Sequence, residues 1–241
     1  MPEDRLFTTV VIPAYNEEAS IGKVLAAIDS QAVDDVIVVD NGSTDATVEV
    51  ARNGDARVVA EPRRGYGSAC LAGLAAIRPE TECVIFLDAD FSDSPEELPA
   101  LSSPIINDVA DLVIGSRIRG QREPGALAPQ ALFGNKLACF LIRLIWRHSY
   151  TDLGPFRAVR RSALDRLKMR DRNFGWTVEM QVRAVQEGLR IEEVPVPYRR
   201  RIGKSKITGT VMGTFSAGYK ILYTIALLYF RHGGRQGKRS R

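Results

Sequence analysis

The sequence predicts an α/β fold in which helices cover both faces of a mostly parallel central sheet. Short apolar runs alternate along the chain with segments whose apolar residues recur at helical spacing. The runs are apolar at successive positions, which is typical of strands buried on both faces, as in parallel sheets. With 241 residues, 45% of them hydrophobic and 26% charged, the chain is long enough for one large domain with a proper core.

Five apolar runs in the first half are the expected strands. They are residues 9–12, 36–39, 57–60, 84–87 and 112–115.

Helices are expected between these strands. Residues 21–28 and 69–77 carry apolar side chains at helical spacing. Ser94 followed by Pro95 is typical of an N-cap with proline at the first helical position. Because strand and helix alternate, the strands are expected to pair in parallel.

The second half begins with a loop over residues 120–128, which are rich in glycine, proline and charge. A helix is expected over 132–146, a polar turn over 151–155 and another helix over 176–187. We find no internal repeat and no low-complexity stretch. The pattern therefore predicts one globular domain that continues to residue 206.

The remaining segment, 207–241, is predicted to hold an apolar helix and a basic tail. Residues 207–230 are long enough to cross a bilayer, but Lys220 and several glycines interrupt them. A helix that lies on a membrane is therefore favoured over one that spans it. The plainer interpretation, a helix packed on the domain or on a partner, stays open.

Charge is distributed unevenly along the chain. Residues 199–241 carry 11 Lys and Arg and no acid, whereas residues 1–198 carry 22 Lys and Arg against 29 Asp and Glu. A block of one sign favours an anionic partner such as a membrane surface, although a solvated tail has the same composition. We expect no nucleic-acid partner.

Three cysteines, Cys70, Cys83 and Cys139, are odd in number and widely spaced, so neither a zinc site nor a disulfide framework is indicated. Residues 1–5 carry acids where an export signal needs positive charge. These observations predict a cytoplasmic protein.

Asp88 and Asp90 form the strongest local signal, because they follow an apolar strand directly and are two residues apart. In extended chain, side chains at this spacing point the same way, toward the sheet edge where open α/β folds bind ligands. Two carboxylates together with diphosphate oxygens suit Mg²⁺ or Mn²⁺. A turn with helix-capping acids is the plainer interpretation of this motif alone.

Two further polar clusters, 13–18 and 40–45, follow the first and second expected strands. Parallel strands end at one sheet edge, so these clusters should converge on the acidic pair. Asp40 and Glu17 could accept hydrogen bonds from a base or ribose, and Tyr15 offers a stacking face. The Asn-Gly-Ser within the second cluster is also a plain turn.

A glycine-rich turn, residues 63–68, opens the third expected helix and could bring a phosphate to backbone amides. It does not match the dinucleotide-binding fingerprint, because Cys70 stands where the third glycine belongs. The chain also lacks a P-loop motif, which excludes that class of nucleotide hydrolase.

These clusters, together with residues 115–117, 152–157, 176–180 and 200–206, resemble the family-2 glycosyltransferases. The resemblance runs from about residue 10 to residue 206, and it is greatest to the dolichyl-phosphate mannose synthase and polyprenyl-phosphate glycosyltransferase branch. It implies a GT-A fold over 1–206, inverting transfer from a nucleotide diphosphate sugar, and Mg²⁺ or Mn²⁺ as cofactor.

The resemblance also implies roles for individual residues. The implied metal ligands are Asp88 and Asp90. The implied nucleotide-sugar contacts are Pro13, Tyr15, Glu17, Asp40, Gly67, Asp88, Ala89 and Asp90, with Arg200 and Lys206 on a mobile basic loop. The implied acceptor contacts are Arg117, Asn135 and Arg157. The implied catalytic set is Asp88, Asp90, Arg117, Asp152 and Glu179. Ser92 replaces a glutamine that is common in the family, which would leave a metal position to water.

Asp152 and Glu179 have two interpretations. A hydroxyl acceptor would need one such carboxylate as general base. Alternatively, Asp152 caps a turn and Glu179 pairs with Arg157 or Arg183. We favour the structural interpretation, since a phosphate acceptor is already anionic and needs no base.

The expected function is transfer of a hexose from a UDP- or GDP-sugar to a polyprenyl phosphate, dolichyl phosphate or other lipid acceptor, at the cytoplasmic face of a membrane. Transfer to a soluble or hydroxyl acceptor and a non-catalytic membrane scaffold are the alternatives. A nucleotidyltransferase is disfavoured, because residues 13–18 do not supply its basic glycine-rich loop. A homo-oligomer or a small membrane subunit as partner stays open.

Overall fold

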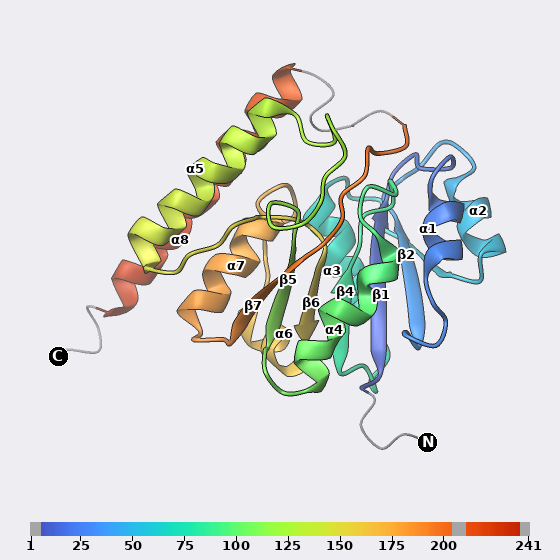
Figure 1. Cartoon of the computed structure of the whole chain (residues 1–241), viewed down its shortest axis with the longest axis horizontal. Coiled ribbons are helices and arrows are strands. Elements are labelled where there is room, and N and C mark those ends of the chain that lie inside the picture. Colours follow the sequence, from blue (N-terminus) through green and yellow to red (C-terminus); the bar gives the residue numbers. More distant parts are fainter. Residues whose placement is uncertain (1–5, 204–210, 237–241) are drawn as a thin grey trace.

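The computed structural model describes residues 6–203 and 211–236, and it contains one mixed sheet flanked by helices (Figure 1). Its strand order is β3-β2-β1-β4-β6-β5-β7. The strands are β1 (Thr8–Ala14), β2 (Asp35–Asp40), β3 (Arg57–Ala60), β4 (Cys83–Phe86), β5 (Leu112–Ser116), β6 (Arg157–Arg160) and β7 (Ile191–Pro195).

The sheet is mostly parallel, as the sequence predicts. Strand β1 pairs in parallel with β2 and β4, β2 with β3, and β5 with β7. Strand β6 runs antiparallel to both of its neighbours, β4 and β5. All five expected strands are present as β1 to β5. Strands β6 and β7 have no continuous apolar run. Strand β6 begins with Arg157 and ends with Arg160, and two glutamates interrupt β7.

Helices cover both faces of the sheet, and the alternation of side chains along the strands builds two cores. On β1, Val10 and Ile12 point into the core under α1, α2 and α4, whereas Val11 points into the core under α3, α5, α6, α7 and α8. The helices are α1 (Ile21–Ala27), α2 (Thr47–Asn53), α3 (Tyr66–Ala76), α4 (Leu98–Ile106), α5 (Pro129–Trp146), α6 (Arg161–Leu167), α7 (Trp176–Gln186) and α8 (Val211–Gln236).

The start of α4 differs from the expectation. A 3₁₀ turn, Pro95–Glu97, precedes the helix, and the Ser94 side chain makes no capping hydrogen bond. Proline does occupy the first position of the turn, where its missing N–H costs nothing.

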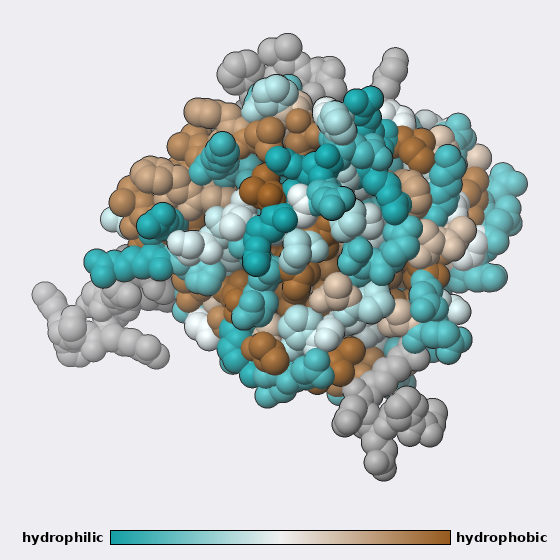
Figure 2. All heavy atoms as spheres, in the orientation of Figure 1, coloured by the Kyte–Doolittle hydropathy of each residue, from teal (hydrophilic) through white to brown (hydrophobic). Residues whose placement is uncertain are grey.

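Helices α5 and α8 lie side by side at one end of the molecule (Figure 1). Among the described side chains, every large exposed apolar one except Val109 belongs to these two helices. Phe133, Phe140 and Leu144 of α5 are 69%, 59% and 65% exposed, and apolar atoms gather over α5 in Figure 2. Within the described part of the chain, no helix is both long and apolar enough to cross a membrane.

Candidate functional site

A pocket of about 330 Å³ opens at the carboxyl ends of β1, β2 and β4. This is the sheet edge where α/β folds bind ligands. Three polar clusters predicted to converge do meet here, and the start of α3 and the segment before α7 complete the wall. The lining residues are Pro13, Ala14, Tyr15, Glu17, Asn41, Arg64, Gly65, Tyr66, Ala69, Asp88, Ala89, Asp90, Asn173, Phe174 and Arg201.

Asp88 and Asp90 form the acidic floor of this pocket. Asp88 Oδ1 accepts a hydrogen bond from the Tyr66 hydroxyl at 3.1 Å. Asp90 is 7% exposed, and its Oδ1 accepts the Ser92 N–H at 2.9 Å and the Ser92 hydroxyl. Loss of hydration, and then the charge of Asp90, raise the pKa of Asp88 to about 7. The pair therefore holds negative charge that needs a positive counterpart.

A divalent cation fits this arrangement. Both carboxylates are hard oxygen donors, and the raised pKa of Asp88 reflects charge that a cation would neutralise. Among the described residues, no group of three or more metal-binding side chains occurs. Two protein ligands leave the other coordination positions to water or to phosphate oxygens, as Mg²⁺ and Mn²⁺ require at nucleotide sites.

The opposite wall of the pocket offers a surface for a nucleoside. The Arg64 guanidinium stacks on the Tyr15 ring, 3.2 Å from its centroid. Asn41 donates to the carbonyls of Glu61 and Arg63 and accepts the Gly65 N–H, so it fixes the turn that carries Arg64. The stacked pair presents a flat face at which a base could lie.

Asp40 stands beside this wall and not in it. Its Oδ1 accepts the Ser43 N–H at 2.9 Å, which closes the turn after β2, while its neighbour Asn41 lines the pocket. Asp40 thus takes part in the turn after β2, and its predicted contact with the nucleoside stays a prediction.

Gly67, expected to contact the nucleotide sugar, is also outside the lining. A side chain there would collide with the Asp171 carbonyl, and one at Gly65 would collide with the Arg172 carbonyl. Ser68 N–H donates to that same Arg172 carbonyl at 2.9 Å. The glycines therefore allow close packing of α3 against the segment 170–175, and the predicted contact of Gly67 with the nucleotide sugar stays a prediction.

Segment 170–175 links the pocket to α8. Asn173 and Phe174 line the pocket, while Asp171 pairs with Lys220 of α8 at 3.0 Å. Glu179 holds the segment from α7: one of its oxygens accepts the N–H groups of Arg170 and Asp171, and the other pairs with Arg183 at 2.8 Å. Glu179 thus has the structural role that we favoured from the sequence.

The basic segment after β7 contributes Arg201, which the sequence analysis did not single out. Arg201 Nη2 lies 3.1 Å from Glu17 Oε1, and Nη1 lies 3.2 Å from Asp90 Oδ2. Arg200 points elsewhere and donates to the Pro124 carbonyl at 2.6 Å. Lys206 lies outside the described residues. In a run of three arginines, sequence alone cannot tell which one faces the pocket.

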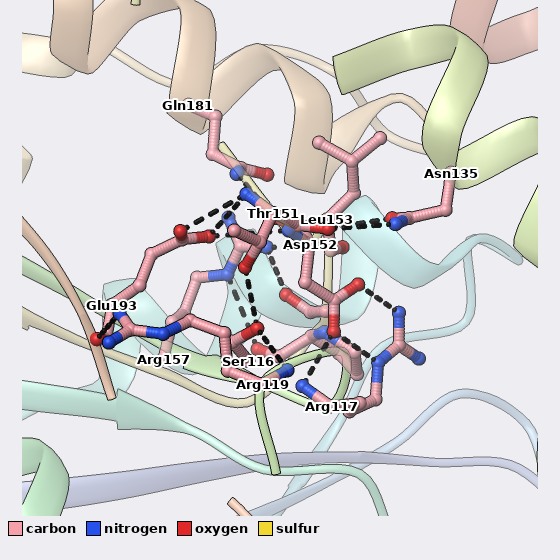
Figure 3. Close-up of polar contacts among 12 residues, drawn as sticks. Ser116, Arg117, Arg119, Asn135, Thr151, Asp152, Leu153, Arg157, Gln181 and Glu193 are labelled. Atoms are coloured by element: carbon pink, nitrogen blue, oxygen red, sulfur yellow. Dashed lines mark hydrogen bonds and ion pairs between the residues drawn. The ribbon is translucent and has the colours of Figure 1, made fainter. Parts of the chain in front are cut away.

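A second polar cluster surrounds Arg117, at the end of β5 (Figure 3). Arg117 donates from its backbone N–H and from Nε to Asp152 Oδ2, both at 2.8 Å, and from Nη2 to Oδ1 at 2.7 Å. Asp152 is fully buried. Both of its oxygens are therefore engaged by Arg117, so the structure shows an ion pair where a turn cap was expected.

Asn135 and Arg157 hold the turn that carries Asp152 (Figure 3). Asn135, on α5, donates to the Thr151 carbonyl at 3.1 Å and accepts the Leu153 N–H at 2.8 Å. Arg157 is fully buried and donates to four backbone carbonyls, including that of Gly154. This burial disagrees with the acceptor contact expected of Arg157, because no surface reaches its guanidinium.

Asp93, which the sequence analysis passed over, is a buried carboxylate near both clusters. It is 1% exposed, and neither carboxylate oxygen has a hydrogen-bond partner among the described residues. Burial, and then the charge of Asp88, raise its pKa well above the usual range. Only the fold reveals such burial, because the local sequence looks like an ordinary polar turn.

The chain is similar to known proteins along most of its length. Residues 9–168 match the model of the family described as "Glycosyl transferase family 2". An uncharacterized glycosyltransferase of Mycobacterium tuberculosis is 41% identical, over 87% of this chain and 93% of its own. The dolichyl-phosphate hexose transferase of Haloferax volcanii is 37% identical, over 82% of this chain and 85% of its own.

Among solved structures, glucosyl-3-phosphoglycerate synthase from Mycobacterium tuberculosis, in complex with Mn²⁺, uridine diphosphate and glucosyl-3-phosphoglycerate, has a similar fold. The TM-score is 0.75 at 25% identity, over 92% of this chain and 80% of the synthase. The similarity agrees with the expected GT-A fold.

Proposed function

Because this chain belongs to glycosyl transferase family 2, we propose that it transfers a hexose from a nucleoside diphosphate sugar to a polyprenyl or dolichyl phosphate. The match over residues 9–168 and the relative at 41% identity confirm the family expected from the motifs. The protein is a glycosyltransferase that depends on a divalent metal. The sugar, the nucleotide and the acceptor are the proposed part.

Asp88 and Asp90 on one side of the pocket and Tyr15 on the other support a nucleoside diphosphate sugar as the donor. Asp88 and Asp90 would hold Mg²⁺ or Mn²⁺, which would neutralise charge on the departing diphosphate. Tyr66 orients Asp88 through its hydroxyl, and Ser92 orients Asp90. Tyr15 and Arg64 give the base a face at the other end of the pocket. The similar fold of a synthase solved with Mn²⁺ and uridine diphosphate supports a divalent metal and a nucleoside diphosphate as ligands.

The ion pairing of both candidate bases supports a phosphate acceptor. Arg117 contacts both carboxylate oxygens of Asp152. Arg183 contacts one carboxylate oxygen of Glu179, and two backbone amides donate to the other. A hydroxyl acceptor needs a carboxylate that can take its proton, whereas a phosphate oxygen attacks as an anion. Arg117, held at the end of β5 by Asp152, is the residue we assign to the acceptor phosphate.

A lipid as carrier of that phosphate is supported by the relative named dolichyl-phosphate hexose transferase. The exposed apolar side chains of α5 and α8 supply a face that could lie against a membrane. Residues 199–241, with 11 positive and no negative side chains, match an anionic surface in charge. Peripheral attachment at the cytoplasmic face follows from this proposal.

A soluble phosphorylated acceptor is the second candidate, supported by the fold shared with glucosyl-3-phosphoglycerate synthase. Transfer to a hydroxyl of such a molecule would require a base, and neither Asp152 nor Glu179 is placed for that role.

The test is a matrix of UDP- and GDP-sugars against polyprenyl phosphate in vesicles and 3-phosphoglycerate in solution, with Mn²⁺ present. Release of nucleoside diphosphate that requires the lipid phosphate supports the proposal. Release that requires phosphoglycerate alone would overturn the lipid assignment.

The same assay tests whether turnover needs a divalent cation at Asp90. We expect Asp90→Ala to abolish turnover while the variant keeps its circular dichroism spectrum, because one of two protein ligands is lost. Equal turnover with and without EDTA would contradict the role of the metal.

A further inference from the structure

Arg201 bridges two carboxylates that come from different strand ends. Glu17 follows β1 and Asp90 follows β4, and the Arg201 guanidinium lies 3.1 Å from the first and 3.2 Å from the second. The side chain is 30% exposed, so the bridge lies at the mouth of the pocket. It is the point where the basic segment after β7 meets the acidic floor.

The backbone fixes this bridge from both sides. The Ile202 N–H donates to the Asp90 carbonyl at 2.9 Å, and the Arg199 N–H donates to the Ser92 carbonyl at 2.8 Å. Arg201 lies between these two bonds. Main-chain pairing with residues 90–92 therefore holds the backbone of Arg201 beside Asp90.

Asp90 consequently has both of its oxygens engaged. Oδ1 accepts from Ser92, and Oδ2 faces Arg201 Nη1. A cation that approaches Asp90 from the pocket therefore meets a positive guanidinium at Oδ2. The same residue that belongs to the expected metal site is thus already paired with a positive group.

We propose that Arg201 is an exchangeable counter-ion, which holds the place of the divalent cation at Asp90 and moves to the diphosphate when the nucleotide arrives. This inference rests on the proposed function for the donor. A diphosphate offers anionic oxygens that match a guanidinium in bidentate geometry. Arg201 Nε is buried and has no partner among the described residues, so the present arrangement leaves one donor of the side chain unused.

The exchange makes cation and nucleotide bind cooperatively. A free cation competes with Arg201 and gains little, whereas a cation that enters with a diphosphate leaves Arg201 with a new partner. The two ligands therefore strengthen each other, and the coupling passes through one named side chain.

The experiment measures Mn²⁺ affinity without turnover, by electron paramagnetic resonance of free Mn²⁺ or by calorimetry, with and without UDP and GDP. In the wild type we expect weak binding of Mn²⁺ alone and binding at least about tenfold tighter with the matching nucleotide. In Arg201→Gln we expect Mn²⁺ alone to bind about tenfold more tightly than in the wild type, and the gain from nucleotide to shrink.

Arg199→Gln is the matched control. It removes the same charge two residues away, where Arg199 pairs with Glu96 at 2.9 Å and not with the acidic floor. We expect its Mn²⁺ affinity to equal that of the wild type. Arg201→Lys keeps the charge but cannot bridge both carboxylates in a planar fork, so it should fall between wild type and Arg201→Gln. If Arg201→Gln does not fold, the Mn²⁺ affinity of Arg201→Lys tests the proposal in its place.

The outcomes separate this inference from the proposed function. If the wild type binds Mn²⁺ with a nucleotide but Arg201→Gln and Arg201→Lys bind Mn²⁺ alone no more tightly than the wild type, the exchange is wrong and the donor site stands. If no nucleotide promotes Mn²⁺ binding to the wild type, the donor assignment fails. Tighter binding of Mn²⁺ alone to Arg199→Gln as well would reduce the effect to net charge and overturn the exchange.

Discussion

Folding buries the Asp88 carboxyl group, which disfavours its ionised form. Its pKa is raised to about 7, so its protonated form is the one that stabilises the protein. That contribution is complete below the ordinary pKa of an aspartate and is lost as pH rises through about 7.

We therefore expect Asp88→Asn to unfold at a higher temperature than the wild type at pH 8 in EDTA, by roughly a few degrees for a chain of this size. The difference should narrow toward pH 5, because the wild-type side chain is then protonated. Differential scanning fluorimetry over this pH range measures it, and a constant difference would point to a cause other than ionisation. The same variant should lose turnover.

Asp152 and Arg117 form a pair in which each side chain depends on the other. Asp152 is fully buried and Arg117 is 13% exposed, so removal of the acid leaves a desolvated cation without a partner. We expect Asp152→Ala to lower the free energy of unfolding by about 3–5 kcal/mol. Urea denaturation followed by circular dichroism provides the measurement.

The double variant Asp152→Ala with Arg117→Met is the matched control for that prediction. It should regain much of the lost stability, since no unpaired charge remains, while staying inactive. A small loss of stability in Asp152→Ala, or no recovery of stability in the double variant, would contradict the mutual dependence of the pair.

The segment 170–175 acts as a spacer between α3, α7 and α8, and its position depends on a glycine in α3. A methyl group at Gly67 would meet the Asp171 carbonyl, so Gly67→Ala must displace the segment that carries Asn173 and Phe174. We expect about tenfold weaker binding of the nucleotide sugar, close to the loss of one good contact. Isothermal titration calorimetry measures this loss.

Gly134→Ala, in α5, is the control for the glycine substitution. Nothing lies within 4 Å of the added methyl group, and alanine favours the helix by roughly 0.5–1 kcal/mol. Its nucleotide affinity should match that of the wild type. A loss of affinity in both variants would show that helix stability and not the packing at Asp171 controls binding.

The sequence predicts where the strands end better than it predicts which single side chain enters the pocket. The apolar runs of β1 to β5 predict the parallel sheet and bring Asp88, Glu17 and Tyr15 to one edge. Strand β6 escapes prediction because its pairing with β4 and β5 depends on contacts distant in sequence. For the same reason the sequence cannot show that Arg201 enters the pocket while Arg200 turns toward Pro124.

The exposed apolar side chains of α5 and α8 form the part of the molecule that we propose meets a lipid surface. With Arg143 in the last turn of α5 and with Phe140 and Leu144 exposed, binding to anionic vesicles should be reversible and weaken as salt rises. We expect Phe140→Glu with Leu144→Glu to reduce co-sedimentation with such vesicles several-fold at low salt.

Val109→Glu is the matched control, because Val109 is an apolar residue, 56% exposed, that lies on neither helix. It should bind vesicles as the wild type does. Absence of binding by the wild type at low salt would refute the membrane role, and binding that survives high salt would indicate an inserted helix.

The ion pair between Asp171 and Lys220 joins α8 to the segment 170–175, which also lines the donor pocket. Asp171 lies in the segment that carries Asn173 and Phe174, and Thr224 of α8 packs against Gly175 in the same segment. If α8 rests on a membrane, occupancy of the pocket and residence on the bilayer belong to one thermodynamic cycle. Whatever factor the nucleotide sugar adds to vesicle affinity, vesicles must add to nucleotide affinity. If that factor is greater than one, the enzyme binds its donor most tightly at the bilayer that carries its acceptor.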